Sequence, residues 1–139
     1  MLIRFMNLSL KIAGLAIFLT EGSHSQKGKG GKRIEIVNSN PSIVSCFLKF
    51  FESYYKIDRK RLRGRVQVHY IEDVGRSERY WSAITKIPVA QFQKPIIKKR
   101  SMSKKSFNIL KNGTFTLIYH DTRLYNKIEG DAQETFNKL

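Results

Sequence analysis

The chain has 139 residues and a formal net charge of +15, from 26 Lys and Arg against 11 Asp and Glu. This length predicts a single domain, and a hydrophobic content of 41% excludes a disordered chain because it supplies a core to bury. The excess of positive charge predicts a polyanionic partner, with nucleic acid first and an anionic membrane surface second.

An apolar stretch near the N-terminus predicts the first helix, over residues 7–21. Ala16 and Thr20 lie four residues apart on one face, where small side chains would let a second helix approach closely. Glu21 ends this helix, and Gly22 lets the chain turn out of it. The helix dipole disfavours a carboxylate at a C-terminus, which argues against a purely structural role for Glu21.

The same stretch shares features with a secretory signal peptide, because Arg4 and Lys11 precede an apolar run over residues 12–19. This run is too short to span a bilayer and is followed by an acid. We therefore expect a cytoplasmic, nucleoid-associated protein without a membrane partner, and secretion is the alternative.

A Gly- and Lys-rich segment, residues 22–33, predicts a flexible hairpin loop with a short strand on each side. The second of these strands, over residues 33–39, alternates isoleucines with Arg33 and Glu35. The loop lacks the Lys-Ser/Thr ending of a P-loop, so we expect it to touch a phosphate backbone rather than to cradle a nucleotide.

Asn40 and Pro41 predict the start of a second helix, as a capping residue followed by proline in the first turn. The apolar residues after them recur at helical spacing and are expected in the core: Ile43, Val44, Phe47, Leu48, Phe51 and Tyr54. Cys46 falls in the same run as a buried, inert thiol. Because it is the chain's single cysteine, it excludes an internal disulfide and is typical of a reducing compartment.

Residues 63–70 alternate between polar and apolar side chains and predict a strand. Arg63, Arg65, Gln67 and His69 share one face, and the opposite face is apolar. A strand of this kind can lay its polar face into a groove of nucleic acid.

The rest of the chain alternates helical and extended patterns. The expected elements are a helix over 77–86, an extended basic segment over 92–100, a polar loop over 101–112, a strand over 114–120 and a last helix from 122 to about 129, capped by Asp121. The whole order predicts one α+β domain over residues 1–139, with helices on one face of an antiparallel sheet.

The stretch from Gly14 to Gly22 resembles the LAGLIDADG motif of homing endonucleases, although Leu19 stands where the family often has its first aspartate. Segments downstream extend the resemblance over nearly the whole chain: Glu35-Ile36-Val37-Asn38-Ser39-Asn40-Pro41, Tyr80-Trp81-Ser82, Gln91-Phe92-Gln93-Lys94-Pro95, Gly113-Thr114 and Tyr119-His120-Asp121-Thr122. The series is similar to a compact, single-motif branch of the family. It implies a motif helix over 7–22, a curved antiparallel sheet and a C-terminal helix and tail over 121–139.

The resemblance also implies a DNA endonuclease that uses Mg²⁺. Glu21 takes the metal-binding acid position with Gly22 beside it, and Lys98 is loosely analogous to the catalytic-pocket lysine of the family. A single motif implies a homodimer that brings two acids together on a near-palindromic site. The helix face expected to form the interface consists of Gly14, Ala16, Ile17 and Thr20.

Basic residues gather in clusters on the expected strands and on the loops that join them. The predicted contacts to double-stranded DNA are Lys29, Lys32, Arg33, Arg61, Arg63, Arg65, Gln67, His69, Lys94, Lys99 and Arg100. Phosphate neutralisation would supply most of the affinity, and Arg33, Arg65 and Gln67 would read bases. A merely solvated basic surface is the alternative, although such surfaces usually mix both signs of charge.

Two other functions stay open at this point. One is a LAGLIDADG-like module that binds DNA in a regulatory role and does not cleave it. The other is an RNA-binding protein that assists splicing.

Overall fold

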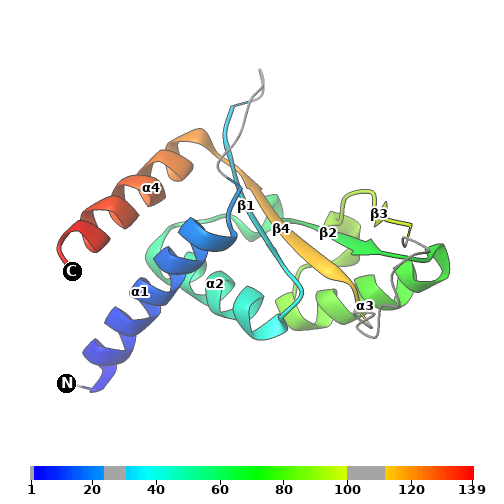
Figure 1. The fold of residues 1–139 in the computed structure, drawn as a ribbon, viewed down its shortest axis with the longest axis horizontal. Helices are drawn as coiled ribbons and strands as arrows, with labels where there is room; N and C mark the ends of the chain where they lie inside the picture. The colour runs from blue at the N-terminus through cyan, green and yellow to red at the C-terminus, as the bar shows by residue number, and fades with distance from the viewer. Residues whose placement is uncertain (1, 24–30, 100–111) are drawn as a thin grey trace.

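The fold is known from a computed structural model that describes residues 2–23, 31–99 and 112–139. Within these residues the elements are α1 (Leu2–Glu21), β1 (Arg33–Asn38), α2 (Pro41–Tyr54), β2 (Arg63–Val68), α3 (Val74–Thr85), β3 (Ile96–Ile97), β4 (Thr114–His120) and α4 (Thr122–Asn137). The α+β class predicted from the sequence is confirmed. Figure 1 shows α1 and α4 side by side at one end, with both chain termini, and α3 at the other end.

The described strands form one sheet in the order β1-β4-β2-β3. β4 pairs antiparallel with both β1 and β2, whereas β3 runs parallel to β2, with Gln67 opposite Ile96. The prediction of an antiparallel sheet is therefore wrong at this edge. The connection through α3 is long enough to return the chain to the same end of the sheet, which a parallel pair requires.

The strand expected before the Gly-rich loop is reduced to a single bridge. Gly22 pairs antiparallel with Ile36, and the Ser23 amide donates to the Glu35 carbonyl at 3.0 Å. The end of α1 therefore lies along the outer edge of β1. Most of the predicted loop, residues 24–30, lies outside the described part of the chain.

All four described helices contribute to one hydrophobic core on one face of the sheet. Alternate strand residues supply the floor of that core: Ile34, Ile36, Val66, Phe115, Leu117 and Tyr119. Trp81 of α3 stacks on Phe115 with ring centroids 5.0 Å apart, which fixes α3 over the same face. The prediction that helices cover one face is confirmed, and the opposite face carries no described helix.

α2 is the central helix of the core. Its N-cap, Asn40, accepts a hydrogen bond from the Ser42 amide at 2.9 Å, as the Asn-Pro pair predicts. Of the expected core residues, Val44, Phe47, Leu48 and Phe51 are buried, Ile43 is partly buried and Tyr54 lies at the surface. Phe50 was not predicted but is fully buried, because α2 packs against α1 as well as against the sheet.

The helix ends differ from the sequence-based expectations in places. α1 begins at Leu2 rather than at residue 7, and α4 continues to Asn137 rather than ending near residue 129. α3 begins at Val74 rather than at residue 77 and ends before Pro88, where Lys86 takes a left-handed φ of 63°. The predicted cap of α4 is confirmed, since the Asp121 carboxylate accepts from the Leu124 amide at 2.9 Å.

Candidate nucleic-acid interface

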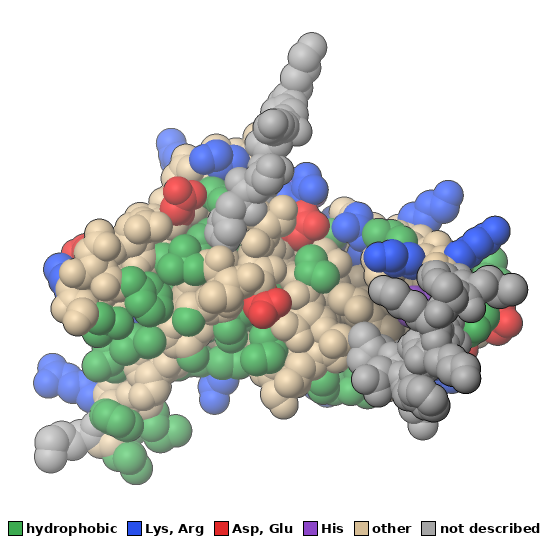
Figure 2. Space-filling model, in the orientation of Figure 1, with side chains coloured by type: hydrophobic (Ala, Val, Ile, Leu, Met, Phe, Trp, Pro, Cys, Tyr) green, Lys and Arg blue, Asp and Glu red, His purple; other side chains and the backbone are tan. Residues whose placement is uncertain are grey.

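The face of the sheet opposite the helices is mostly polar and carries three arginines and one glutamate, and we call it the open face. Its residues follow from the strand register: Arg33, Glu35 and Val37 of β1, Thr114, Thr116, Ile118 and His120 of β4, and Arg63, Arg65 and Gln67 of β2. Figure 2 shows Lys and Arg side chains spread along the upper edge of the molecule, from the start of α4 to β2 and β3. The strand alternation predicted for Arg63, Arg65 and Gln67 is confirmed.

Glu35 lies between two arginines on this face. Arg33 Nε donates to Glu35 Oε2 at 2.5 Å, and Arg65 Nη2 lies 3.7 Å from Glu35 Oε1. The Glu35 side chain is only 10% exposed, whereas Arg33 and Arg65 are 42% and 28% exposed. The carboxylate is therefore held beneath two guanidinium groups that reach solvent.

The strand β4 passes under this ion-pair cluster. Glu35 lies opposite Ile118, and Arg65 lies opposite Thr116, so the two charged side chains face each other diagonally across β4. Ile118 is 2% exposed and Thr116 is 6% exposed although no described helix covers them. The long side chains of the flanking strands cover them instead, so the cluster rests on an apolar floor that strengthens its electrostatics.

Arg61 and Arg63, two of the predicted DNA contacts, also bond within the chain. Arg61 Nη2 donates to the His120 carbonyl, and its guanidinium lies 4.8 Å from the centre of the Tyr119 ring. Arg63 Nη1 donates to two carbonyls of the preceding turn, at 2.7 and 2.8 Å. These bonds hold both guanidinium groups within the chain, and part of their hydrogen-bonding capacity is already used.

The other predicted contacts are spread more widely. Lys32 lies against α4, where its Nζ donates to Asn126 Oδ1 at 3.2 Å. His69 Nδ1 donates to the Lys98 carbonyl at 2.7 Å, and Lys94 and Lys99 are exposed beside β3. Lys29 and Arg100 lie outside the described residues.

Glu21, the predicted metal-binding acid, is exposed at the end of α1. Because Gly22 bridges to Ile36, Glu21 lies at the outer edge of β1, beside the open face. Among the residues that the structure describes, no cationic side chain forms an ion pair with it. Its carboxylate is therefore accessible to solvent.

Lys98 is not brought near Glu21. It follows β3, and its amide donates to the Val68 carbonyl at 2.8 Å, at the opposite edge of the sheet. Counted from Gly22, which bridges to the outer side of β1, four strand spacings of about 4.8 Å lead to β3, which is about 19 Å. The pairing of Glu21 and Lys98 in one catalytic pocket is therefore wrong for a single chain, because β3 joins the sheet on the far side of β2.

Two of the four residues predicted for the dimer face of α1 are buried, and two reach the surface. Gly14 and Ile17 are buried within the chain, so their assignment to an interface between copies is wrong. Ala16 is half-buried, and Thr20 is exposed with its hydroxyl donating to the Ala16 carbonyl at 2.8 Å. The C-terminal half of α1 packs against α2 and α4, and of the four residues predicted for the interface only Ala16 and Thr20 reach the surface.

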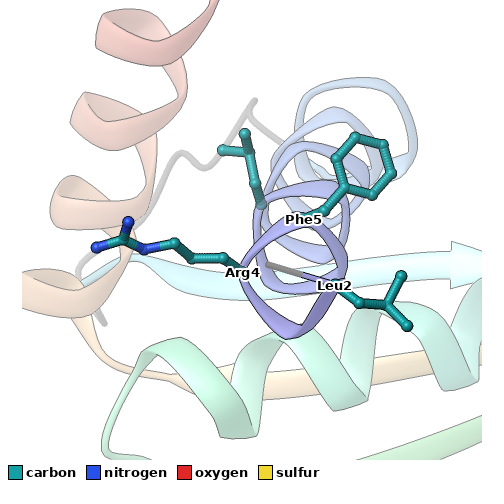
Figure 3. Close-up of a pocket in the computed structure, with 4 residues that line it drawn as sticks. Leu2, Arg4 and Phe5 are labelled. Atoms are coloured by element: carbon teal, nitrogen blue, oxygen red, sulfur yellow. The ribbon is translucent and has the colours of Figure 1, made fainter.

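The exposed apolar surface of α1 lies nearer its N-terminus. Leu2, Ile3, Phe5, Met6 and Leu8 are between 55% and 76% exposed. Leu2 and Phe5 point to one side of the helix and Arg4 to the other (Figure 3). The lower left of Figure 2, where α1 begins, is correspondingly rich in hydrophobic side chains. We call residues 2–8 the apolar end of α1.

The apolar end lengthens the hydrophobic run beyond the one noted in the sequence. The whole of α1 is long and apolar enough to cross a membrane, with 17% of its most apolar window buried. The expectation of a run too short to span a bilayer concerned residues 12–19 alone, and α1 extends over Leu2–Glu21. A core helix or a signal sequence meets the same criterion.

A Mg²⁺ ion requires oxygen ligands, which carboxylate side chains can supply. Among the described residues, no group of three His, Cys, Asp or Glu side chains lies together. Mg²⁺ is usually held by one or two carboxylates together with substrate phosphates and water. Glu21 alone therefore fits half of such a site, which a second copy and a DNA phosphate would have to complete.

Comparisons of the chain with protein-family models, with curated proteins and with solved structures give no match.

Glu35 is the residue of this face that sequence reasoning missed. The alternation of β1 placed it beside Arg33, but the pattern gave no sign that it would be buried. Its second partner, Arg65, comes from β2, and β4 lies between the two strands. The one signal in the sequence was an acidic residue, Glu35, close to the basic residues Lys32 and Arg33.

Proposed function

We propose that this chain binds double-stranded DNA on the open face of its sheet and that two copies cleave it with a divalent cation. The observation that carries this proposal is the one-sided construction of the sheet. All described helices cover one face, and the other presents Arg33, Arg63, Arg65 and Gln67. A basic surface formed by strands can provide both phosphate contacts and readout of base edges.

The spacing of β2 supports a groove-facing role. Arg63, Arg65 and Gln67 occupy alternate positions on one face, so neighbouring members lie about 6.7 Å apart along the strand. Two base-pair steps of DNA span a similar distance, about 6.8 Å. Arg favours guanine and Gln favours adenine in the major groove, which makes Arg65 and Gln67 the residues best suited to read sequence.

Duplex DNA is favoured over duplex RNA by groove shape. The major groove of B-form DNA admits a β-ribbon, whereas that of A-form RNA is too deep and narrow for side chains to read. We expect duplex DNA to outcompete duplex RNA of the same sequence at equal salt. The reverse order would favour the RNA-binding alternative.

Cleavage rests on Glu21, which lies beside the open face with an accessible carboxylate. When bound, a divalent cation would polarise the scissile phosphate and activate water. Glu21 would hold that cation, and the basic residues of the open face would position the DNA backbone. One chain offers one such acid, so a second copy is required for both strands.

The second candidate is a DNA-binding module that does not cleave. The separation of Glu21 from Lys98 across the sheet favours it, as does the burial of Gly14 and Ile17. In addition, Phe5 of the apolar end lies about 24 Å along α1 from Glu21, at 1.5 Å per residue. Two copies joined at that end bring their acids together only if their helices run side by side along their full length.

The test uses purified protein, a randomised duplex library and Mg²⁺, with Glu21→Gln as the key variant. Glu134→Gln is the matched control, because Glu134 lies on α4 and pairs with Lys138 at 2.9 Å. We expect both variants to bind DNA with wild-type affinity, and only Glu21→Gln to lose cleavage. Binding without cleavage by the wild type would favour the module, and absence of binding to duplex DNA at low salt would overturn the proposal.

A further inference from the structure

We propose that Glu35 is a positioning residue that gives the open face its discrimination between DNA sequences, an inference that rests on the DNA binding proposed above. In this role the carboxylate would not contact DNA. It would orient Arg33 and Arg65 and cancel part of their charge. Arg33 and Arg65 would then bind DNA sites whose hydrogen-bond acceptors match that orientation, in preference to any phosphate within reach.

The first support is the burial of an acid where the surface is otherwise basic. Of the three side chains in this cluster, Glu35 is 10% exposed and lies beneath Arg33 and Arg65. A carboxylate loses several kcal/mol of hydration on burial unless cations and hydrogen bonds replace the water. A polar residue that served only solubility would stay exposed, so the covered acid serves the two arginines.

The second support is the difference in distance between Glu35 and its two arginine partners. The bond from Arg33 Nε to Glu35 Oε2 is short, at 2.5 Å, whereas Arg65 Nη2 stays 3.7 Å from Oε1, beyond a hydrogen bond. Arg65 Nε is buried and has no hydrogen-bond partner among the described residues. That buried atom cannot reach an outside acceptor, but the side chain is 28% exposed and its Nη2 is not hydrogen-bonded to Glu35, so the Nη groups keep capacity for an outside acceptor.

The third support is the floor of the cluster. Ile118 and Thr116 are buried beneath these side chains, so water is excluded from one side of the ion pairs. Charge interactions in such a setting are stronger than between fully hydrated groups. Removal of the negative charge at Glu35 should therefore change the orientation and effective charge of the two arginines more than the same removal would at an exposed ion pair.

The inference separates two properties that Glu35 would supply. Its negative charge would weaken sequence-independent binding, and its length would set the direction of the guanidinium groups. Glu35→Gln removes the charge and keeps the size, whereas Glu35→Asp keeps the charge and shortens the side chain. A role in folding alone predicts that both variants lose stability and that DNA binding by the folded fraction stays the same.

The control is Glu52→Gln. Glu52 of α2 also forms an ion pair with an arginine, Arg59, but it does not belong to the open face. Both Glu→Gln variants raise the net charge from +15 by one, so they differ only in the place where the charge is lost. Thermal unfolding of each variant establishes the folded fraction before binding is measured.

The experiment measures affinity for a random 30-base-pair duplex across a salt series, and then enrichment from a randomised duplex library. We expect Glu35→Gln to bind the random duplex several-fold more tightly than Glu52→Gln, with a salt slope steeper by about 0.9, equivalent to one more phosphate. We expect Glu35→Asp to match the wild type on the random duplex. Both Glu35 variants should lose enrichment that the wild type and Glu52→Gln retain.

Two results would overturn the inference while leaving the proposed function in place. One is equal behaviour of Glu35→Gln and Glu52→Gln, and the other is enrichment by Glu35→Asp identical to that of the wild type. If Glu35→Gln does not fold, the aspartate variant decides the question by its enrichment. Failure of the wild type to bind any duplex at low salt overturns the proposed function and this inference with it.

Discussion

Gly14 of α1 lies against the ring of Phe50 of α2, so closely that a Cβ at position 14 would come within 2.0 Å of Phe50 Cγ. Real side chains do not approach to this distance. The glycine therefore sets the separation between α1 and α2. This contact holds the C-terminal half of α1, and with it Glu21, in place against the sheet.

We expect Gly14→Ala to lower the free energy of unfolding by about 1–3 kcal/mol, because the added methyl group overpacks the seam between the helices. Gly130→Ala is the matched control. Gly130 lies in α4 with nothing within 4 Å of a Cβ, so alanine there should stabilise the helix by about 0.5–1 kcal/mol. Urea denaturation followed by tryptophan fluorescence measures both changes.

The alternative role of Gly14, in contact between two copies, predicts a different result. In that case Gly14→Ala would change the dimer dissociation constant and leave the unfolding of the monomer as in the wild type. An unchanged midpoint of denaturation would thus contradict the packing seen here.

The sequence determined local features better than features that depend on distant segments. The strand of β4, the caps Asn40 and Asp121 and the alternation of β2 follow from residues close in the chain, and all are confirmed. The small-residue face of the first helix was also visible, but whether Gly14 meets Phe50 or a second copy depends on where α2 docks.

The open face shows the same limit. Strand alternation placed Arg33 and Arg65 on polar faces, but only the sheet order makes them neighbours of one buried Glu35. The parallel edge formed by β3 was missed for a related reason. β3 has only two residues, which is too short for an alternating pattern that would indicate its partner strand. Because β3 pairs with β2, Lys98 lies at the edge of the sheet far from Glu21.

Tyr55 connects the end of α2 to α4, and its environment predicts a loss of stability in alkali. Its hydroxyl donates to Asp131 Oδ2 at 2.8 Å. Burial first, and then the hydrogen bond and the charge of Asp131, raise the pKa of the Tyr55 hydroxyl well above its ordinary value of 10.0. The folded chain holds this proton more tightly than the unfolded chain. The stability that Tyr55 contributes is therefore full below pH 10 and is lost as the pH rises above it.

We expect the melting temperature of the wild type to fall more steeply between pH 10 and pH 11 than that of Tyr55→Phe. The variant should also be less stable by about 1 kcal/mol at neutral pH, because it loses one hydrogen bond. Tyr70→Phe is the control, since Tyr70 is 44% exposed. Its melting temperature should fall with pH between pH 10 and pH 11 as steeply as that of the wild type. Equal slopes for the wild type and Tyr55→Phe would contradict this reading of the contact.

The apolar end of α1 predicts where two copies meet. Phe5 and Leu8 are 68% and 55% exposed, so replacing both with glutamine should leave the fold of one chain intact. We expect the wild type to form dimers and the double variant to shift toward monomers, because the change removes apolar surface that a second copy would bury. Size-exclusion chromatography with light scattering measures the mass of each.

Ile71→Gln is the control for this change, since Ile71 is 74% exposed and lies in the turn before α3, away from α1. It should dimerise as the wild type does. A wild type that stays monomeric at high concentration would contradict the prediction.

Arg61 and Arg65 were both predicted to contact DNA, and the structure separates their expected effects. Arg61 bonds to the His120 carbonyl, lies over the Tyr119 ring and is 3.8 Å from Asp121, so Arg61→Gln should lower the free energy of unfolding by about 1 kcal/mol. Arg65 reaches solvent from the middle of the sheet, with its side chain 28% exposed and its Nη2 3.7 Å from Glu35 Oε1, beyond a hydrogen bond.

We expect Arg65→Gln to weaken binding to an enriched duplex by about 1–3 kcal/mol, the usual cost of one lost base contact, and Arg61→Gln to weaken it much less. Lys127→Gln removes the same charge from α4, where Lys127 pairs with Asp131, and it should leave both stability and affinity near the wild type. Fluorescence anisotropy and urea denaturation on the same three variants give the two free energies. If Arg61→Gln costs more affinity than Arg65→Gln, the DNA lies over the end of β4 at His120 rather than over the centre of the open face.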